Sequence, residues 1–324
     1  MSLRRPPTPP HIVVIGGANT DFLVRAARLP QPSETITGHE FDHAEAGGKG
    51  ANQAVAAARL GARVTFIGRV GTDDRGRALL RQLKDEGIDV RHVAKDRRVP
   101  TGVALIGVDA HGEKQILVAP GANTHLTAAD IRRAAPVINR ASVLILQFEV
   151  PMIANLAAAR LAHRAGIPIV LDPAPAAKPP KELLRCVTVL RANEHEAEAL
   201  TGVRVKDRRT AQKAATRLLE LGPRAAIISA GEGNLAVWRE GTPAIHSLWL
   251  PRLRVKAIDA TGAGDAFAAA LAVALAEGQP IATAASFANA AAALATTQLG
   301  AQQALPRRAA VLALLRRTAR SHTL

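Results

Sequence analysis

Short apolar runs rich in β-branched residues alternate along the chain with longer segments that are rich in Ala and Leu and have a helical pattern. Nearly continuous apolar strands that alternate with helices are typical of a mostly parallel sheet covered by helices on both faces. The chain is therefore predicted to form one layered α/β domain over residues 11–320, after a disordered Arg- and Pro-rich tail over residues 1–10. Strands are expected at residues 11–15, 64–67, 143–146, 167–171, 187–190 and 225–229, and helices at 50–60, 75–86, 128–139, 153–165, 210–221, 264–277 and 282–297.

Two stretches break this alternation and are predicted to form a small β-lid. Residues 21–44 have an extended character, and a hairpin-like turn at 109–112 lies between two further apolar runs. Strands this close in sequence cannot be parallel neighbours, because parallel pairing needs a long crossover connection. We therefore expect a lid formed by about residues 19–46 and 99–119. A lid excludes water during group transfer, so it indicates an enzyme.

The composition restricts the class of protein. The single cysteine, Cys186, excludes an intramolecular disulfide and a cysteine-based zinc site, which indicates a reducing compartment, and we expect a cytoplasmic protein. No apolar run approaches the ~18 residues that a membrane span needs. The formal net charge of +15 suggests a polyanionic partner such as a nucleic acid. Against a nucleic-acid-binding protein, the Arg residues are scattered and only 2% of the residues are aromatic, too few to stack on bases.

The segment Asp259-Ala-Thr-Gly-Ala-Gly-Asp265 leads into one of the predicted helices. Gly262 and Gly264 allow the backbone to approach a ligand closely, and the free N–H groups of the first helical turn form an anion hole. Asp265 is placed to accept a proton from a hydroxyl that attacks a phosphoryl group. An equally good alternative is that Asp265 only caps the helix by accepting hydrogen bonds from its first turn.

The segment Gly47-Gly-Lys-Gly-Ala-Asn52 opens another predicted helix. It is not a Walker A loop, because Gly50 follows Lys49 where that motif requires Ser or Thr. What remains is a Gly-rich turn that brings the backbone close to a ligand, with Lys49 and Asn52 as hydrogen-bond donors. The alternative is a tight β-to-α turn that needs glycine only for a positive φ.

Polar residues also follow several predicted strands, where open α/β sheets bind ligands. Asn19 and Asp21 alternate along an extended segment and are suited to neighbouring hydroxyl groups, with an Asx turn as the alternative. Glu149 follows another strand, and a Gly-rich turn at 229–234 is suited to hold a nucleotide.

Asn193 and Glu196 lie three residues apart, again just after a predicted strand. This spacing places both side chains on one face of a helical turn, as outer-sphere ligands of hydrated Mg²⁺. A capping box produces the same spacing for purely structural reasons.

Two longer segments carry a family resemblance. Residues 47–61 (GGKGANQAVAAARLG) and 259–265 (DATGAGD) resemble the two signatures of the PfkB sugar kinase family. Further matches are similar to the ribokinase branch of that family, and the resemblance extends in order from about residue 11 to residue 317. These matches are PSET at 32–35, TGVA at 101–104, PGAN at 120–123, DPAP at 172–175 and NEHE at 193–196.

The resemblance implies a ribokinase-like fold, a three-layer Rossmann-like domain with a β-lid, and a homodimer in which the lids of two subunits clasp. It implies ATP-dependent phosphorylation of the 5-hydroxyl of D-ribose, with another sugar of the deoxyribose or fructose type, or a nucleoside, as the alternative. The family's general base is matched by Asp265, and its anion hole by Gly262, Ala263 and Gly264. Its sugar ligands are matched by Asn19, Asp21, Gly48, Lys49, Asn52, Glu149 and Asp265. ATP is expected at Asn193, Ser229, Ala230, Gly231, Glu232, Gly233, Asn234, Gly264 and Asn289, and Glu196 completes an Asn-x-x-Glu motif tied to Mg²⁺.

The resemblance also implies an activating K⁺ beside the anion hole, held mostly by backbone carbonyl groups. Two positions depart from the family pattern. Ala260 replaces a hydroxyl-bearing or branched residue, and Ala304 replaces a Ser whose hydroxyl reaches the ion. Activation by K⁺ is still expected, because most of the ligands are backbone oxygens. The matching positions are Asp259, Thr261, Ala295, Gln298 and Gly300, with Ala304 as the sixth.

Overall fold

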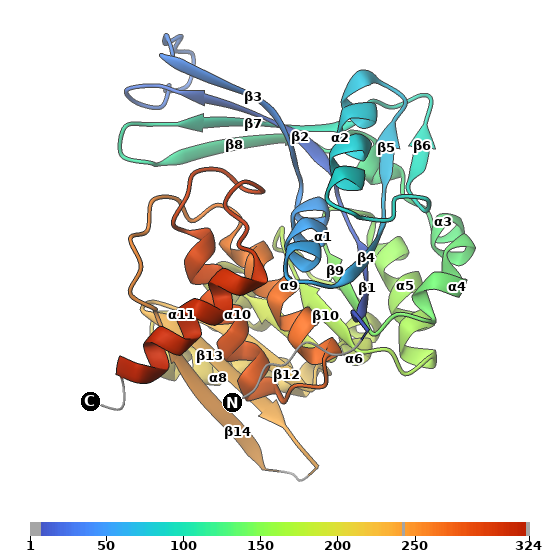
Figure 1. Ribbon diagram of the computed structural model, residues 1–324, viewed down its shortest axis with the longest axis vertical. Helices are drawn as coiled ribbons and strands as arrows, with labels where there is room; N and C mark the ends of the chain where they lie inside the picture. Colours follow the sequence, from blue (N-terminus) through green and yellow to red (C-terminus); the bar gives the residue numbers. More distant parts are fainter. Residues whose placement is uncertain (1–7, 242–243, 322–324) are drawn as a thin grey trace.

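An eight-stranded sheet forms the centre of the molecule (Figure 1). The structure, a computed structural model, describes residues 8–241 and 244–321. The neighbouring strands β4, β1, β9, β10, β11 and β12 pair in parallel. Two antiparallel strands, β13 and β14, extend the sheet at one edge. In spatial order the strands are β14 (Ile245–Pro251), β13 (Gly233–Arg239), β12 (Ala225–Ala230), β11 (Val189–Ala192), β10 (Ile169–Asp172), β9 (Val143–Gln147), β1 (His11–Ile15) and β4 (Arg63–Ile67).

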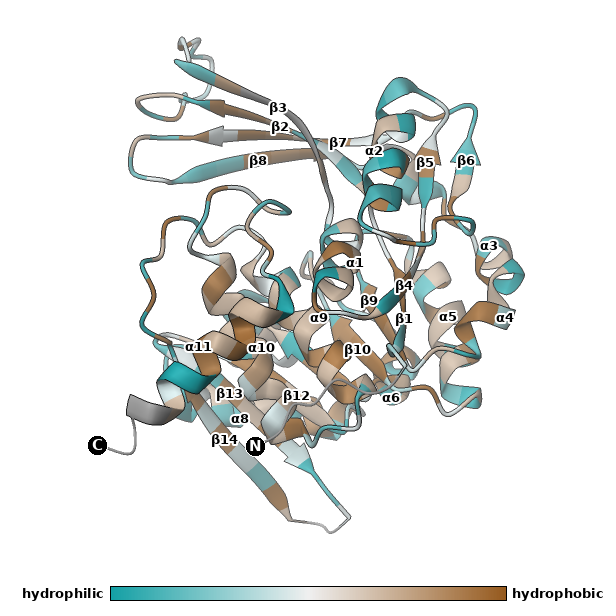
Figure 2. Cartoon of the chain, viewed as in Figure 1, coloured by the Kyte–Doolittle hydropathy of each residue, from teal (hydrophilic) through white to brown (hydrophobic). Residues whose placement is uncertain are grey.

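Helices cover both faces of this sheet, as the alternation in the sequence predicts. In β1, Ile12 and Val14 pack into one hydrophobic core and Val13 and Ile15 into the other, because successive strand residues point to opposite faces. Figure 2 shows the apolar residues concentrated in these strands and in the helices against them. The first core is covered by α1 (Lys49–Arg59), α2 (Asp74–Asp85), α9 (Ala263–Ala276), α10 (Ile281–Ala295) and α11 (Arg308–Ser321). The second is covered by α3 (Ala128–Arg133), α4 (Ala135–Ile138), α5 (Met152–Arg164), α6 (Lys181–Cys186), α7 (Glu194–Thr201) and α8 (Arg208–Leu221).

The expected small sheet is present and projects from the main body (Figure 1). Its central strand β2 pairs antiparallel with β3 on one side and parallel with β7 on the other. We refer to this sheet as the lid. Its strands in spatial order are β3 (Glu40–Gly47), β2 (Asn19–Arg25), β7 (Gly102–Val108) and β8 (Lys114–Ala119).

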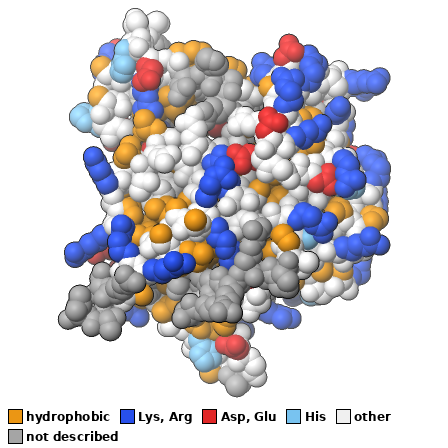
Figure 3. Space-filling view, in the orientation of Figure 1, with side chains coloured by type: hydrophobic (Ala, Val, Ile, Leu, Met, Phe, Trp, Pro, Cys, Tyr) orange, Lys and Arg blue, Asp and Glu red, His pale blue; other side chains and the backbone are white. Residues whose placement is uncertain are grey.

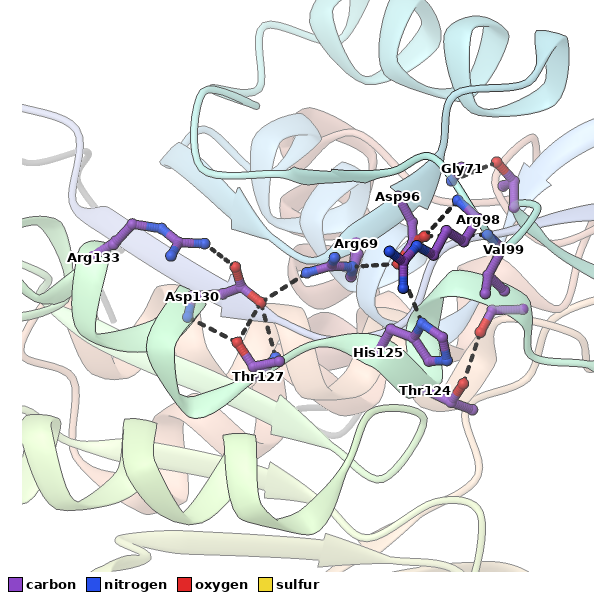
Figure 4. A network of polar contacts seen from close by, with 12 residues as sticks. Arg69, Gly71, Asp96, Arg98, Val99, Thr124, His125, Thr127, Asp130 and Arg133 are labelled. Carbon is purple, nitrogen blue, oxygen red and sulfur yellow. Dashed lines mark hydrogen bonds and ion pairs between the residues drawn. The ribbon is translucent and has the colours of Figure 1, made fainter.

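A network of polar contacts fixes the chain at the base of the lid (Figure 4). The Arg69 guanidinium donates to the carboxylates of Asp96 and Asp130 at 3.0 and 3.1 Å. Asp96 also accepts hydrogen bonds from the backbone N–H groups of Arg98 and Val99. These contacts hold the segment that leads into β7. The network joins α3 to β5 (Arg69–Gly71), β6 (Ala94–Asp96) and the 3₁₀ helix η1 (Gly121–His125).

Parts of the fold differ from the prediction. The helix expected at 128–139 is divided into α3 and α4, because Pro136 lacks an N–H and is accommodated in the first turn of a new helix. The sequence reading did not include β13, β14 or α11. The tail expected at residues 1–10 lies mostly outside the described residues. Within the described residues, no helix is both long and apolar enough to cross a lipid bilayer.

Candidate active site

Polar side chains converge where the parallel strands end and two helices begin. β9 ends at Gln147 and β10 at Asp172, and both side chains are fully buried. α1 begins at Lys49 and α9 at Ala263, and these helices contact each other and β9. The structure therefore brings the two Gly-rich segments together at the sheet edge where open α/β folds bind ligands.

Asp265 is the third residue of α9, and its carboxylate does not cap that helix. The N-cap residue is Gly262, with φ of 75°, and no side chain makes a capping hydrogen bond there. Instead, Asp265 Oδ2 accepts from Asn52 Nδ2 at 3.0 Å and Oδ1 accepts from Gln53 Nε2 at 2.9 Å. Two amides of α1 thus hold a buried carboxylate beside the helix N-terminus, an arrangement suited to a general base.

Gln53 and Asp172 belong to this site, although the sequence reading missed their place in it. Gln53 Nε2 donates to Asp172 Oδ2 at 2.9 Å as well as to Asp265, and Gln147 Nε2 donates to Gln53 Oε1 at 2.6 Å. The sequence contains a signal that could have placed both residues in the site. Gln53 lies four residues after Lys49 and so on the same helix face, and Asp172 ends a predicted strand.

Lys49 is the cation among these carboxylates. Its Nζ lies 3.8 Å from Asp172 Oδ2. Burial alone would lower the pKa of Lys49, but the carboxylates of Asp172, Asp265 and Glu149 raise it overall. Glu149 Oε2 accepts from the Lys49 backbone N–H at 2.8 Å, yet burial raises the pKa of Glu149 to about 7. Burial also raises the pKa of Asp172 to about 6, so these two carboxyl groups titrate near neutral pH.

Asn19 and Asp21 lie in strand β2 of the lid and not in an Asx turn. Asn19 Oδ1 accepts from Asn123 Nδ2 at 2.8 Å. The Asp21 carboxylate lies against Gly47, where an added Cβ would come within 2.0 Å of Asp21 Oδ2. Gly48, with φ of 85°, lies close to the backbone of Asn19, whose nitrogen would be 2.9 Å from an added Cβ. The glycines therefore bring the start of α1 against the lid strand.

A cavity of ≈180 Å³ lies between the lid and the segments on either side of α9 and α10. Its walls include Asp21 from β2, Lys114 from β8, and Asp259 and Thr261 from the segment before α9. Of the expected sugar ligands, Asp21 lines this cavity. The other expected ligands form the contacts at the start of α1.

A larger cavity of ≈620 Å³ holds three of the residues expected to bind ATP. Ser229 Oγ donates to Asn234 Oδ1 at 2.9 Å, and Asn234 Nδ2 donates to Asn289 Oδ1 at 3.0 Å. The remaining walls combine apolar side chains with Arg191 and Arg252. The other expected residues of this segment, Ala230, Gly231, Glu232 and Gly233, form the tight turn of the β12–β13 hairpin and do not line the cavity.

Arg191, in β11, is a further residue that the sequence reading missed. Its Nη1 lies 3.8 Å from Asp172 Oδ1, and its Nη2 donates to Ser229 Oγ at 3.4 Å. An added Cβ on Gly264 would come within 2.8 Å of Arg191 Nη1, so the guanidinium lies directly beside the start of α9. It adds positive charge next to the N-terminus of α9. The apolar residues next to Arg191 in β11 give no indication in the sequence that its side chain reaches this site.

Asn193 and Glu196 form a capping box at the start of α7. Glu196 Oε2 accepts from the Asn193 backbone N–H at 2.8 Å, and Oε1 accepts from Asn193 Nδ2 at 2.9 Å. Both carboxylate oxygens are thus engaged, and Glu196 is buried. In the described part of the chain, no group of three or more His, Cys, Asp or Glu is placed to hold a metal ion.

The residues expected to hold K⁺ are arranged around Asp259. Asp259 Oδ1 accepts from the Thr261 backbone N–H at 2.9 Å, and Oδ2 accepts from the Gly300 N–H at 3.1 Å. The ammonium of Lys114 contacts both the Asp259 carboxylate and the Thr261 hydroxyl. Burial acts to raise the pKa of Asp259, but the hydrogen bonds from Lys114 and Thr261 lower it overall. Of the other expected ligands, Ala295 ends α10, Gln298 is exposed and Ala304 is buried.

Comparison with known proteins agrees with this geometry. The profile of the pfkB family of carbohydrate kinases matches residues 9–308. The chain is 38% identical to a ribokinase of Haemophilus influenzae over 94% of its own length and 98% of that protein. It is 35% identical to a deoxyribokinase of Salmonella typhi, over 79% and 82% of the two chains. The structure of Arabidopsis thaliana ribokinase complexed with ribose and ATP superposes with a TM-score of 0.84 at 32% identity, covering 95% of this chain and 98% of that one.

Proposed function

Because the chain belongs to the pfkB family of carbohydrate kinases, we propose that it transfers the γ-phosphoryl group of ATP to the 5-hydroxyl of D-ribose. The substrate pair is supported by the ribokinases of 34–41% identity and by the ribose and ATP complex of the plant neighbour. It is also supported by the two cavities. One under the lid, which carries polar side chains such as Asp21 and Lys114 among its walls, fits a small sugar, and a larger one with apolar and cationic walls fits a nucleotide.

One observation carries this proposal. Asp259, at the start of the loop that ends at Ala263, lines both cavities, and Asp265 follows in the first turn of α9. A sugar in one cavity and the phosphates of ATP from the other therefore meet at the N-terminus of α9. The buried Asp265 carboxylate lies in the first turn of that helix.

The chemistry follows from this placement. Asp265 accepts the proton of the 5-hydroxyl as its oxygen attacks the γ-phosphorus and ADP leaves. Asn52 and Gln53 hold the carboxylate in position for that transfer. The first-turn N–H groups of α9 and the Arg191 guanidinium stabilise the charge on the transferring group. Ala263 N–H is also bonded to the Ala260 carbonyl at 3.2 Å, so the other first-turn amides carry most of that role.

Sugar recognition is assigned to the lid strand and the start of α1. Asn19 and Asp21 accept hydrogen bonds from hydroxyl groups, and Lys49 donates to them. Glu149 accepts from a hydroxyl in its ionised form. Gly48 allows the sugar to approach the backbone. Asn52 serves both the sugar and Asp265.

ATP is the proposed cofactor, and Mg²⁺ is proposed to arrive with its phosphates. Mg²⁺ in kinases is held mainly by phosphate oxygens and water, and it neutralises charge on the phosphates. Glu196 fits an outer-sphere role here, because both of its oxygens already accept hydrogen bonds within the capping box. For K⁺ the side-chain donors do not fit an added ion, because Lys114 already contacts Asp259 and Thr261 and residue 304 is an alanine.

Two further features complete the proposal. The protein is proposed to act in the cytoplasm, on the basis of its single cysteine. A nucleic-acid-binding role remains the weaker alternative to catalysis, since Figure 3 shows Lys and Arg side chains spread over the visible face and not gathered in one block.

An ADP-release assay tests the proposed function. Ribose, deoxyribose, fructose and adenosine are compared as acceptors, and ribose is expected to give the highest kcat/KM. Deoxyribose is the second candidate because of the similarity to a deoxyribokinase. A chain that releases no ADP with any sugar contradicts the proposal.

The variant Asp265→Asn tests the base. Loss of a general base lowers turnover by about 10²–10⁴-fold, so kcat should fall by that factor while ATP binding, measured by calorimetry, is retained. Asp74, which is also an acidic residue in the first turn of a helix but lies exposed in α2, provides the matched control Asp74→Asn. Activity of Asp265→Asn near that of the control would exclude Asp265 as the base.

A further inference from the structure

The lid contributes a cation to the segment that precedes α9. Lys114, the first residue of β8, places its ammonium on the carboxylate of Asp259 and on the hydroxyl of Thr261. Asp259 in turn binds the backbone N–H groups of Thr261 and Gly300. The Asp259 carboxylate thus contacts the loop before α9, the segment after α10 and the lid. In Figure 1 the β7–β8 hairpin lies over these two segments.

The burial of Lys114 sets it apart from the rest of its strand. The other residues of β8 are exposed, most of them apolar, whereas the Lys114 side chain retains only 23% of its accessible surface. Its partner Asp259 retains 7%. A lysine is normally the most exposed residue of such a strand, so the ammonium is held at this position by its partners.

The negative charge of Asp259 requires a compensating cation. Asp259 lies three residues before Gly262, the N-cap of α9, and its negative charge is largely buried. An uncompensated carboxylate so close to the anion hole would repel the phosphates that the helix N-terminus attracts.

The residues that carry these oxygens, Asp259 and Thr261, are also among those expected to hold K⁺, mostly through backbone carbonyl groups. An ammonium and a K⁺ ion are both compact single charges, and both cannot contact the Asp259 carboxylate and the Thr261 hydroxyl at one position. The Ser hydroxyl that would offer another side-chain donor is replaced by the methyl group of the buried Ala304. The side chains of this chain therefore favour an ammonium over an added ion.

We propose that the Lys114 ammonium takes the place of the activating monovalent cation, so that phosphoryl transfer by this chain does not depend on K⁺. The inference rests on the proposed kinase function. Lys114 acts as a positioning residue, because it touches the loop and not the substrate. Since it belongs to the lid, the charge reaches the loop only when the lid covers the cavity, which couples activation to closure.

The experiment compares KCl with tetramethylammonium chloride at equal ionic strength. Ribose-dependent ADP release by the wild type is expected to proceed at the same rate in both salts. In Lys114→Gln the loss of a charge-assisted contact, worth about 1.5–3 kcal/mol, predicts a roughly 10–100-fold lower rate in tetramethylammonium chloride. KCl is expected to restore the rate of this variant. Lys95→Gln, at an exposed lysine in β6, is the matched control and should match the wild type in both salts.

Melting temperatures without substrate give a second readout. K⁺ should raise the Tm of Lys114→Gln relative to tetramethylammonium and leave that of the wild type unchanged. A wild type that K⁺ accelerates or stabilises overturns the proposal, and so does a Lys114→Gln variant that stays equally slow in both salts, since Lys114 would then only clamp the lid. If the wild type releases no ADP in any salt, the kinase function fails instead, and the Tm comparison still decides whether Lys114 replaces the ion.

Discussion

At the scale of single residues, the site holds more carboxylates than cations. Glu149, Asp172 and Asp265 surround Lys49, and only Arg191 adds a second positive charge close to Asp172. Burial raises the pKa values of Glu149 and Asp172 to about 7 and about 6. At neutral pH the Glu149 carboxyl group is therefore only partly ionised.

Glu149 makes stability depend on pH in a definite direction. Its pKa is about 7 in the folded protein against an ordinary 4.5, so the folded state holds this proton more tightly. The stabilisation that this proton gives the folded state is fully present below pH 4.5, and it is lost as the pH rises to about 7. Relative to Glu149→Gln, the free energy of unfolding of the wild type should therefore fall by up to about 3 kcal/mol across this window. Urea denaturation at a series of pH values measures the difference.

A control variant isolates this effect. Glu182 is an exposed carboxylate in α6, and its hydrogen bond with Arg160 lowers its pKa. The difference curve between the wild type and Glu182→Gln should show no fall over the same window. Parallel curves for the wild type and Glu149→Gln would contradict the raised pKa of Glu149.

Many of the residues that the sequence identified lie in continuous motifs. Asp265 and Asn52 lie in such segments, and the structure joins them by a hydrogen bond. The contact of Lys114 with Asp259 joins residues 145 positions apart. No periodicity or spacing reports a contact of that kind, so the pairing emerges only from the placement of the lid.

At the scale of elements, the base of the lid depends on Arg69. This side chain bridges the buried carboxylates of Asp96 and Asp130, and Asp96 in turn orders the segment that leads into β7. Removing Arg69 leaves the buried Asp96 carboxylate without its guanidinium, although Asp96 keeps its hydrogen bonds and Asp130 keeps Arg133, so Arg69→Met should lower the free energy of unfolding by up to about 3 kcal/mol. Urea denaturation at neutral pH measures this loss.

Arg91 provides the matched comparison for Arg69. Its side chain retains 84% of its accessible surface and pairs with Asp89. Water and salt screen such an exposed pair, so Arg91→Met should leave the free energy of unfolding nearly unchanged. If both variants lost the same free energy of unfolding, the Arg69 bridge would stabilise the protein no more than an exposed ion pair does.

Helices and strands were predictable from the sequence where most of their residues are buried. β1 is buried along its whole length and reads as a continuous apolar run. β14 lies at the sheet edge with most of its residues exposed or half-buried, and it contains His246 and Ser247, so its pattern is not that of a buried parallel strand. The division between α3 and α4 is set by Pro136, whose missing N–H a helical hydrophobic pattern does not reveal.

At the scale of the whole molecule, the outer face of the lid carries large exposed apolar side chains. An antiparallel sheet with one face on the protein normally presents polar residues to water on the other face. Here Phe22 and Phe41 stack at 6.5 Å between ring centroids, and large apolar side chains continue across the four strands. A continuous exposed apolar patch marks an interaction surface. The exposed residues of this patch are Val24, Phe41, Leu105 and Leu117.

We propose that this patch joins two copies of the chain into a homodimer, and Leu117 is the residue that tests it. Leu117 retains 70% of its accessible surface, and burying a charge at a subunit interface is costly, so Leu117→Asp should convert the dimer to a monomer of 34.0 kDa. Ile153, in α5 outside the lid, retains 66%, so Ile153→Asp adds the same charge at an equally exposed position and should remain dimeric. Sedimentation velocity of the three proteins measures the mass. A monomeric wild type, or dissociation by both variants alike, would place the interface elsewhere or remove it.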